Sequence, residues 1–398
     1  MNRHEIRFVV AFIVTSCLGG RATADEKRAL SLDDIYRQEQ FTDFVVSPKG
    51  DEAVYVRNWY DVNLPGKRTS LWRVDGDTGR QEPLEAGEPD GRMPVYSPDG
   101  TYLLFSGATR GFTSPPADLR IPTYSERVGW LWSIDLARQE RRAQMLAFGD
   151  WVPNDGFYGR IAFSATGERF AYIRCRSSAV LSSGPVDRHP TGWRDDQGEG
   201  YEGLRESNIE IGMRPRGGSI SHIDTIRSNF SSPRWLGDPQ WTPEESQLIC
   251  HANLTDDQES VRYSINKNFN LWRFELDKGN NWSDAIGLTS NPGPDVSPRV
   301  SPDGKRVLYL SVPRNGPHND VFNLCVLALG EKDAEPNIVI DAHHADRAAD
   351  GTPPFQPTFP LRDDSWIDDE HVRVRGVRGL KSETLVFNIN RPNEPADD

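Results

Sequence analysis

The chain has 398 residues, of which 36% are hydrophobic and 10% aromatic, and its formal net charge is −13. This length suffices for a large core, and the composition fits one extended all-β domain as well as two smaller domains. The acidic balance disfavours nucleic acid as the main partner, because phosphate binding requires clustered Lys and Arg. A solvated, soluble surface accounts for the charge.

The first residues have the layout of a secretory signal. Arg3 and Arg7 precede an apolar run that is too short to span a bilayer, and the small residues Ala22-Thr23-Ala24 follow it. This pattern predicts a signal peptide over residues 1–24, whose removal leaves Asp25 as the first mature residue.

A lipoprotein signal is the alternative interpretation. Val14-Thr15-Ser16-Cys17 resembles the bacterial lipobox, in which Cys17 would be acylated and would anchor the chain. Both interpretations predict an exported protein, periplasmic or extracellular. A membrane is expected as a partner only through this anchor.

The mature chain is expected to hold one domain of repeats between two short flanking segments. Residues 25–40 are interpreted as an N-terminal extension, with a short helix from Leu30 to Gln40. Residues 41–391 form the predicted repeat domain, and residues 392–398 form a polar tail.

One turn motif recurs along the repeat domain. Its clearest copy is Ser301-Pro302-Asp303-Gly304, which lies between two strand-like runs. Pro sets a negative φ, Asp can bond its own backbone, and Gly adopts the positive φ that other residues resist. Related turns begin at Ser47, Ser97, Ser164 and Thr242 and, more weakly, at Ser365. Six related hairpins predict a repeat protein.

Each hairpin is followed by a further strand-like run, and in some units by a short fourth run. The third runs begin at Leu71, Leu131, Leu271, Leu324 and Leu385, and the equivalent in the third unit is placed at Ile209 to Met213. The short fourth runs include Gln81 to Leu84 and Ser219 to Ile223. Four strands make one blade, so the prediction is an all-β, six-bladed β-propeller, with seven blades or an incomplete last blade as alternatives.

The longest irregular stretch lies in the third unit. It contains an acidic and aromatic segment with Trp193, Asp195, Asp196, Glu199 and Tyr201. Loops on a rigid scaffold often carry function, which makes these five residues the candidate binding loop. A disordered loop is the alternative.

Two other sets of residues are expected to be structural. Cys175, Cys250 and Cys325 are scattered through apolar runs, which favours buried thiols over a disulfide framework. Trp72, Trp132 and Trp272 occupy the same place in their units, which predicts packing between blades.

The late segments resemble the N-terminal propeller of acylaminoacyl peptidases. The likeness rests on segments in the same order, namely Ser297 to Asp303, Val307 to Leu310, Gly316 to Asn319, Asn323 to Leu327, Pro360-Leu361, Ser365 to Asp369 and Glu383 to Phe387. The wider resemblance is to the propellers of prolyl-oligopeptidase-type serine peptidases and of TolB. In the peptidases, the propeller caps an α/β-hydrolase domain that carries the Ser, Asp and His, and it restricts access to peptide-sized substrates.

No catalytic, cofactor-binding or metal-binding residue is expected. A hydrolase nucleophile requires a Gly-x-Ser-x-Gly elbow, which does not occur in this sequence, so no triad residue is carried over from the family. Ser264-Ile265-Asn266-Lys267 is interpreted as a loop rather than a Ser-x-x-Lys site. His343 and His344, near Asp341 and Asp346, point to opposite faces if extended, so they are not expected to grip one metal ion.

These observations predict a non-catalytic, exported propeller module that binds a peptide or a protein partner. One alternative is the propeller portion of a truncated or split serine peptidase of acylaminoacyl-peptidase type, working with a separate hydrolase domain. A second alternative is a TolB-like envelope interaction protein. A serine-reactive probe is expected to separate the first two.

Overall fold

The computed structural model divides into two compact units, Met1–Asn154 and Asp155–Asp398. The residues that it describes are 38–60, 67–84, 90–108, 128–138, 141–146, 152–153, 158–175, 207–215, 218–226, 235–253, 269–314, 321–331, 334–343 and 353–396. Their regular secondary structure is entirely β-strand, as predicted. The described residues include no helix long and apolar enough to cross a membrane.

Unit 1 contains two antiparallel sheets. The first has the strand order β1 (Gln40–Val46), β2 (Glu52–Tyr60), β3 (Lys67–Asp75) and β4 (Gln81–Pro83). The second has the order β5 (Asp90–Tyr96), β6 (Tyr102–Ala108), β7 (Val128–Asp135) and β8 (Ala143–Met145), and β9 (Val152–Pro153) also pairs with β7.

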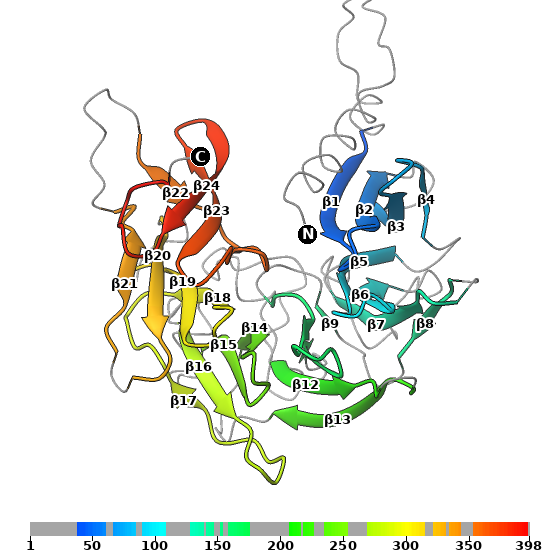
Figure 1. Ribbon diagram of the computed structural model, residues 1–398, viewed down its shortest axis with the longest axis horizontal. Helices are drawn as coiled ribbons and strands as arrows, with labels where there is room; N and C mark the ends of the chain where they lie inside the picture. The colour runs from blue at the N-terminus through cyan, green and yellow to red at the C-terminus, as the bar shows by residue number, and fades with distance from the viewer. Residues whose placement is uncertain are drawn as a thin grey trace, which may run out of the picture. The chain divides into compact units, whose positions relative to one another are not determined.

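Unit 2 contains four sheets, which Figure 1 shows following one another from green to red. Blade three consists of β10 (Ala162–Phe163), β11 (Arg169–Cys175), β12 (Ser207–Met213) and β13 (Ser221–Ile226). Blade four consists of β14 (Trp235–Trp241), β15 (Gln247–Asn253), β16 (Asn270–Glu275) and β17 (Ile286–Gly287). Blade five consists of β18 (Asp295–Val300), β19 (Arg306–Ser311), β20 (Asn323–Ala328) and β21 (Asn337–Ile340), and blade six of β22 (Phe355–Pro357), β23 (His371–Arg378) and β24 (Lys381–Asn388).

The predicted turn is the same structure in five blades. In each, the amide three residues after the turn Ser or Thr donates to the carbonyl of that residue at 2.8–2.9 Å, and the five first residues are Ser47, Ser97, Ser164, Thr242 and Ser301. Gly occupies the amide position in four turns with φ of 67–74°, whereas Glu245 adopts φ 56° in the fifth. The two sheets of unit 1 and the four of unit 2 are therefore the blades of a six-bladed β-propeller, as predicted.

The hydrophobic core lies between consecutive blades within each unit. Leu103, Phe105 and Ile134 of blade two pack against Val54 and Val56 of blade one. In unit 2, three further clusters join blades three to four, four to five and five to six in the same way. In blades one to five the second strand buries both faces, and so it reads as a nearly continuous apolar run. In blade six, β23 alternates buried and exposed residues.

Two predicted elements differ from the structure. The short fourth run predicted at Ser219 to Ile223 is β13, which starts two residues later because a turn closes with Gly218 N donating to Pro215 O at 2.8 Å. The helix expected up to Gln40 is not helical where the structure describes it, since Gln40 opens β1 and pairs with Asn58.

The buried-residue predictions are confirmed for the cysteines and in part for the tryptophans. Cys175, Cys250 and Cys325 are free thiols buried in their blades. Trp132 and Trp272 pack against the clusters between blades. Trp72 is half-buried, and the guanidinium carbon of Arg57 lies 4.6 Å from its ring centroid, a cation–π contact.

Candidate functional site

The first strand of four blades contains a β-bulge at the same place, four residues before the turn. The bulge residues Asp43, Met93, Asp238 and Ser297 all have positive φ, between 51° and 59°. The strand register shifts at each of these positions. A bulge redirects side chains, and here it turns two polar side chains, Asp238 and Ser297, into the interior of unit 2, where both are fully buried.

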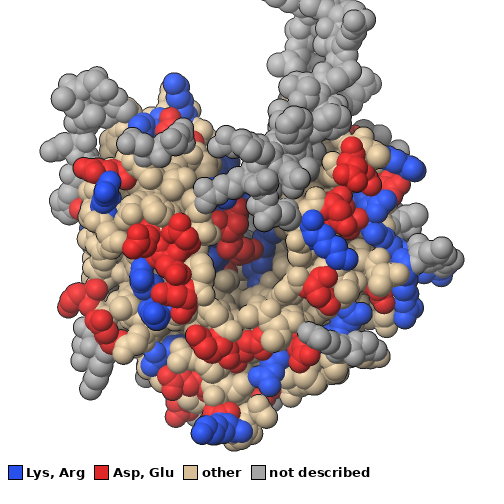
Figure 2. Space-filling view, viewed as in Figure 1, with Lys and Arg blue, Asp and Glu red and all other residues tan. Residues whose placement is uncertain are grey.

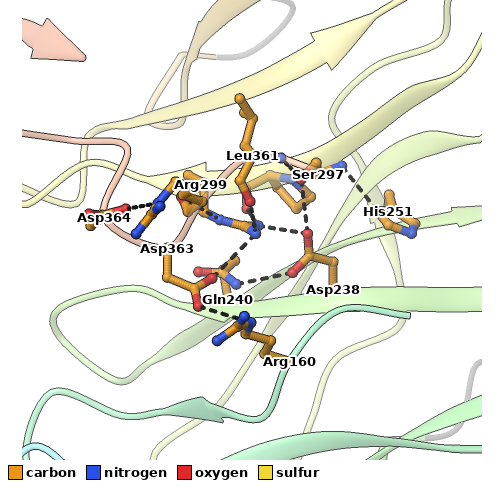
Figure 3. Close-up of polar contacts among 11 residues, drawn as sticks. Arg160, Asp238, Gln240, His251, Ser297, Arg299, Leu361, Asp363 and Asp364 are labelled. Atoms are coloured by element: carbon orange, nitrogen blue, oxygen red, sulfur yellow. Dashed lines mark hydrogen bonds and ion pairs between the residues drawn. The ribbon is translucent and has the colours of Figure 1, made fainter. Parts of the chain in front are cut away.

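Arg299 lies at the centre of this buried group (Figure 3). Its Nη1 donates to Asp238 Oδ2 at 2.6 Å and to Pro298 O at 2.6 Å. Its Nη2 donates to Leu361 O at 2.6 Å and lies 3.3 Å from Asp363 Oδ1, and its Nε donates to Arg362 O at 3.1 Å. The guanidinium thus makes four hydrogen bonds and one further ion-pair contact.

Asp238 links three blades. Its carboxylate accepts from Arg299 of blade five, from Ser297 Oγ at 3.2 Å and, more weakly, from Gln240 Nε2 at 3.4 Å. Its backbone amide donates to Tyr158 O of blade three at 2.8 Å. Leu361 N of blade six donates in turn to Ser297 Oγ at 2.9 Å. We call Asp238, Ser297 and Arg299 the inner polar cluster.

The inner polar cluster and its neighbour His251 include a Ser, a His and an Asp, yet their hydrogen bonds are not those of a nucleophile. In a catalytic triad, the Ser hydroxyl donates to the His and the His is oriented by the carboxylate. Here the Ser297 hydroxyl donates to Asp238, and His251 Nδ1 accepts from the backbone amide of Ser297 at 3.1 Å. None of the three side chains reaches solvent. The arrangement holds blades together and does not activate Ser297.

Electrostatics favour the ionised form of the Arg299–Asp238 pair. Burial alone would lower the pKa of Arg299, but the charges of Asp238 and Asp363 raise it above its ordinary value. Burial raises the pKa of Asp238, and the Arg299 guanidinium opposes that shift. Because a guanidinium stays protonated and lies 2.6 Å from the carboxylate, the two groups form a buried ion pair.

Partly exposed carboxylates of blade six lie beside the cluster. Asp363 is half exposed and lies beside Arg299, and Arg160 Nε lies 4.0 Å from its other oxygen. Asp364, also half exposed, accepts from Arg362 Nε at 2.8 Å. Blade six therefore contributes carboxylates to the exposed rim of a buried cationic centre.

Asp295, at the start of β18, is a second buried carboxylate in unit 2. Asn291 Nδ2 donates to its Oδ1 at 2.5 Å, and burial raises its pKa from 3.8 to about 6. Between these two values the folded chain holds a proton that the unfolded chain has lost. The contribution of Asp295 to the free energy of unfolding should therefore fall by about 3 kcal/mol as pH rises from about 4 to about 6, and stay constant above that.

Urea denaturation of the wild type and of the Asp295→Asn variant, compared across this pH range, isolates the contribution of Asp295. The difference between the two proteins should change in the variant's favour as pH rises. A difference that does not depend on pH would show that Asp295 titrates alike in both states.

The structure does not place the residues that the sequence predicted as a binding loop. Trp193, Asp195, Asp196, Glu199 and Tyr201 lie outside the described residues, as does Ser264-Ile265-Asn266-Lys267. Of the histidine pair, only His343 is described, and its amide donates to Asp341 Oδ1 at 3.2 Å. No three metal-ligating side chains gather within the described part of the chain.

The chain is similar to known proteins in sequence and in structure. No family model matches the chain. It is 23% identical over 349 residues to dipeptidyl-peptidase 5 from Porphyromonas gingivalis, a match that covers 83% of this chain and 46% of that protein. This chain is similar to peptidases.

Solved structures give the same fold. Acylaminoacyl peptidase from Pyrococcus horikoshii matches with a TM-score of 0.51 at 12% identity, over 89% of this chain and 45% of that one. Prolyl oligopeptidase B from Galerina marginata matches with a TM-score of 0.51 at 12% identity, over 91% of this chain and 44% of that one. The resemblance read from the sequence is therefore confirmed for the fold. The chain spans less than half the length of the curated relatives that it matches.

Proposed function

We propose that this chain is a non-catalytic, exported propeller module that binds a peptide or a protein partner. The proposal depends on how Ser297, His251 and Asp238 are hydrogen-bonded. The bonds of this buried group connect neighbouring blades and are not those of a catalytic triad (Figure 3). Similarity to a dipeptidyl-peptidase supports peptides as the ligand class. Export rests on the signal pattern of residues 1–24.

The surface charge supports a peptide or protein partner over nucleic acid. On the face shown in Figure 2, acidic and basic side chains of the described residues are interspersed. A nucleic-acid site would need Lys and Arg gathered in one patch. A surface with both acidic and basic side chains can complement the charged groups of a polypeptide partner.

Peptide retention tests this function. The purified chain, immobilised on beads, is incubated with a random hexapeptide library, and retained peptides are identified by mass spectrometry. We expect a subset of sequences to be enriched over beads that carry albumin. Recovery of the same peptides from both kinds of beads would refute peptide binding.

A second candidate is the propeller portion of a split peptidase that works with a separate hydrolase domain. The observation in its favour is that the peptidase match covers most of this chain and less than half of the relative. If this is correct, a tagged chain purified from its native host should co-elute with a protein that a fluorophosphonate probe labels. An eluate without a labelled partner would reject this candidate. A TolB-like interaction role stays a prediction.

A further inference from the structure

Blade six has the longest outer strand of the six blades. β24 has eight residues, whereas the last strands of the other sheets, β4, β8, β13, β17 and β21, have two to six. In Figure 1, β23 and β24 form a long red hairpin, and among the described strands only β23 pairs with β24. Propellers usually keep their edges short or protected, because an open strand edge is a template for pairing with another chain.

Alternate backbone groups of β24 point away from β23. The carbonyl of Val386 accepts from the amide of Ala396 at 2.7 Å, so Val386 faces the outer edge. Because this direction alternates along a strand, the backbone amides and carbonyls of Ser382 and Thr384 face the same edge. Within the described part of the chain, no backbone hydrogen bond reaches these groups. The segment that ends β24's open edge begins to cover it only at Val386.

The open part of the edge is centred on Ser382. Residues 397 and 398, which follow Ala396, lie outside the described residues. Two extended residues span about 7 Å, whereas Ser382 is four residues, about 13 Å, from Val386 along the strand. These two residues are therefore too short to reach Ser382 from Ala396.

The charged side chains of the edge lie on one face of β24. Phe387 and Leu385 pack in the cluster shared with blade five. Lys381 and Glu383 follow the same two-residue period, so they lie on that face as well. Glu383 Oε2 is 3.6 Å from Arg378 Nε, and 29% of each of these two side chains is exposed. This loose pair leaves the Glu383 carboxylate accessible beside the exposed Lys381.

Charge selects one register for pairing of this edge with a second copy of itself. Since outward-facing residues must oppose one another, a two-fold axis can pass through Lys381, Ser382, Glu383 or Thr384. At Lys381 two ammonium groups would face each other, and at Glu383 two carboxylates would, which is destabilising. An axis at Thr384 would require the Val386 carbonyl, which already accepts from Ala396. Only an axis at Ser382 places Lys381 opposite Glu383, and it does so twice.

We propose that β24 pairs antiparallel with β24 of a second copy of this chain, with the two-fold axis at Ser382. The pairing joins two three-stranded sheets into one. It also brings Leu380, the most exposed large hydrophobic side chain of the described residues, against Thr384 of the second copy. The contact is small, so the dimer is weak and forms at high concentration. This inference goes beyond the proposed function and does not depend on it.

Sedimentation velocity of the purified chain between about 5 and about 500 μM tests the dimer. We expect the weight-average sedimentation coefficient to rise with concentration. Glu383→Lys alone and Lys381→Glu alone should each weaken association about tenfold, because like charges then face each other twice. An equimolar mixture of these two variants should regain wild-type association, because opposite charges face each other in the mixed dimer. Glu331→Lys, an exposed change of the same charge in blade five, is the control and should associate like the wild type.

Three results would overturn the dimer. One is a wild-type chain that stays monomeric over the whole range. Another is association that both single variants leave unchanged. The last is a mixture of folded variants, judged by their melting curves, that associates no better than its components.

Cysteine cross-linking tests the register without altering charge. With the axis at Ser382, the two copies of this residue lie about 5.5 Å apart at Cα, within the range of a disulfide. The two copies of Thr384 are four residues out of register, beyond that range. Under mild oxidation, Ser382→Cys should give a covalent dimer and Thr384→Cys should not, and the wild type measures the background. Both positions are exposed, so both variants should fold. Equal cross-linking of the two variants, or none in either, would contradict the proposed pairing.

Discussion

Replacing Arg299 with Met is expected to lower the free energy of unfolding by about 3–5 kcal/mol, because Asp238 is left charged and buried without its partner. The change also frees the carbonyl oxygens of Leu361 and Arg362, to which Arg299 donates. The first loss falls on the contact between blades four and five, and the second on contacts between blades five and six. Urea denaturation followed by tryptophan fluorescence measures the effect.

Arg362→Met is the matched control. Arg362 also pairs with a carboxylate, Asp364 at 2.8 Å, but both side chains are more than half exposed. An exposed pair contributes about 0–1 kcal/mol, so this variant should denature close to the wild type. Similar losses of unfolding free energy in the two variants would mean that burial does not determine how much the Arg299–Asp238 pair contributes to stability.

Gly159→Ala should destabilise the same region by about 3 kcal/mol. Gly159 has φ 75°, which costs an L residue about 1–2 kcal/mol. An added Cβ would lie 2.4 Å from Asp238 Cα, so the backbone of blade three or four must move. Overpacking of this kind adds about 1–3 kcal/mol. The midpoint of urea denaturation reports the combined loss.

Gly330→Ala is the matched control for the glycine. Nothing lies within 4 Å of a Cβ built at Gly330, so the change should alter stability by less than about 0.5 kcal/mol. If Gly159→Ala proved as mild as Gly330→Ala, the close approach of blade three to Asp238 would not constrain the fold.

The repeat could be predicted from sequence because its turn chemistry is local. Ser301-Pro302-Asp303-Gly304 specifies its hairpin through four adjacent residues, and the third strands follow from apolar runs such as Leu324 to Leu327. The turn beginning at Thr242 was predicted as well, although Glu245 adopts there the positive φ usually taken by Gly. Such local signals are enough to fix blade number and strand order.

The inner polar cluster was not predicted, because its contacts join positions far apart in the chain. Asp238 and Arg299 are 61 residues apart, and Arg299 and Leu361 are 62 apart. The available signal was a polar residue four positions before the turn in the first strand of two consecutive blades, namely Asp238 and Ser297.

Binding without catalysis is the central claim, and fluorophosphonate labelling of the purified chain tests it most directly. The hydroxyl of Ser297 is buried and donates to Asp238, so we expect no labelled serine by mass spectrometry, while a serine peptidase in the same experiment is labelled. Labelling of Ser297 or of any other serine of this chain would contradict the account.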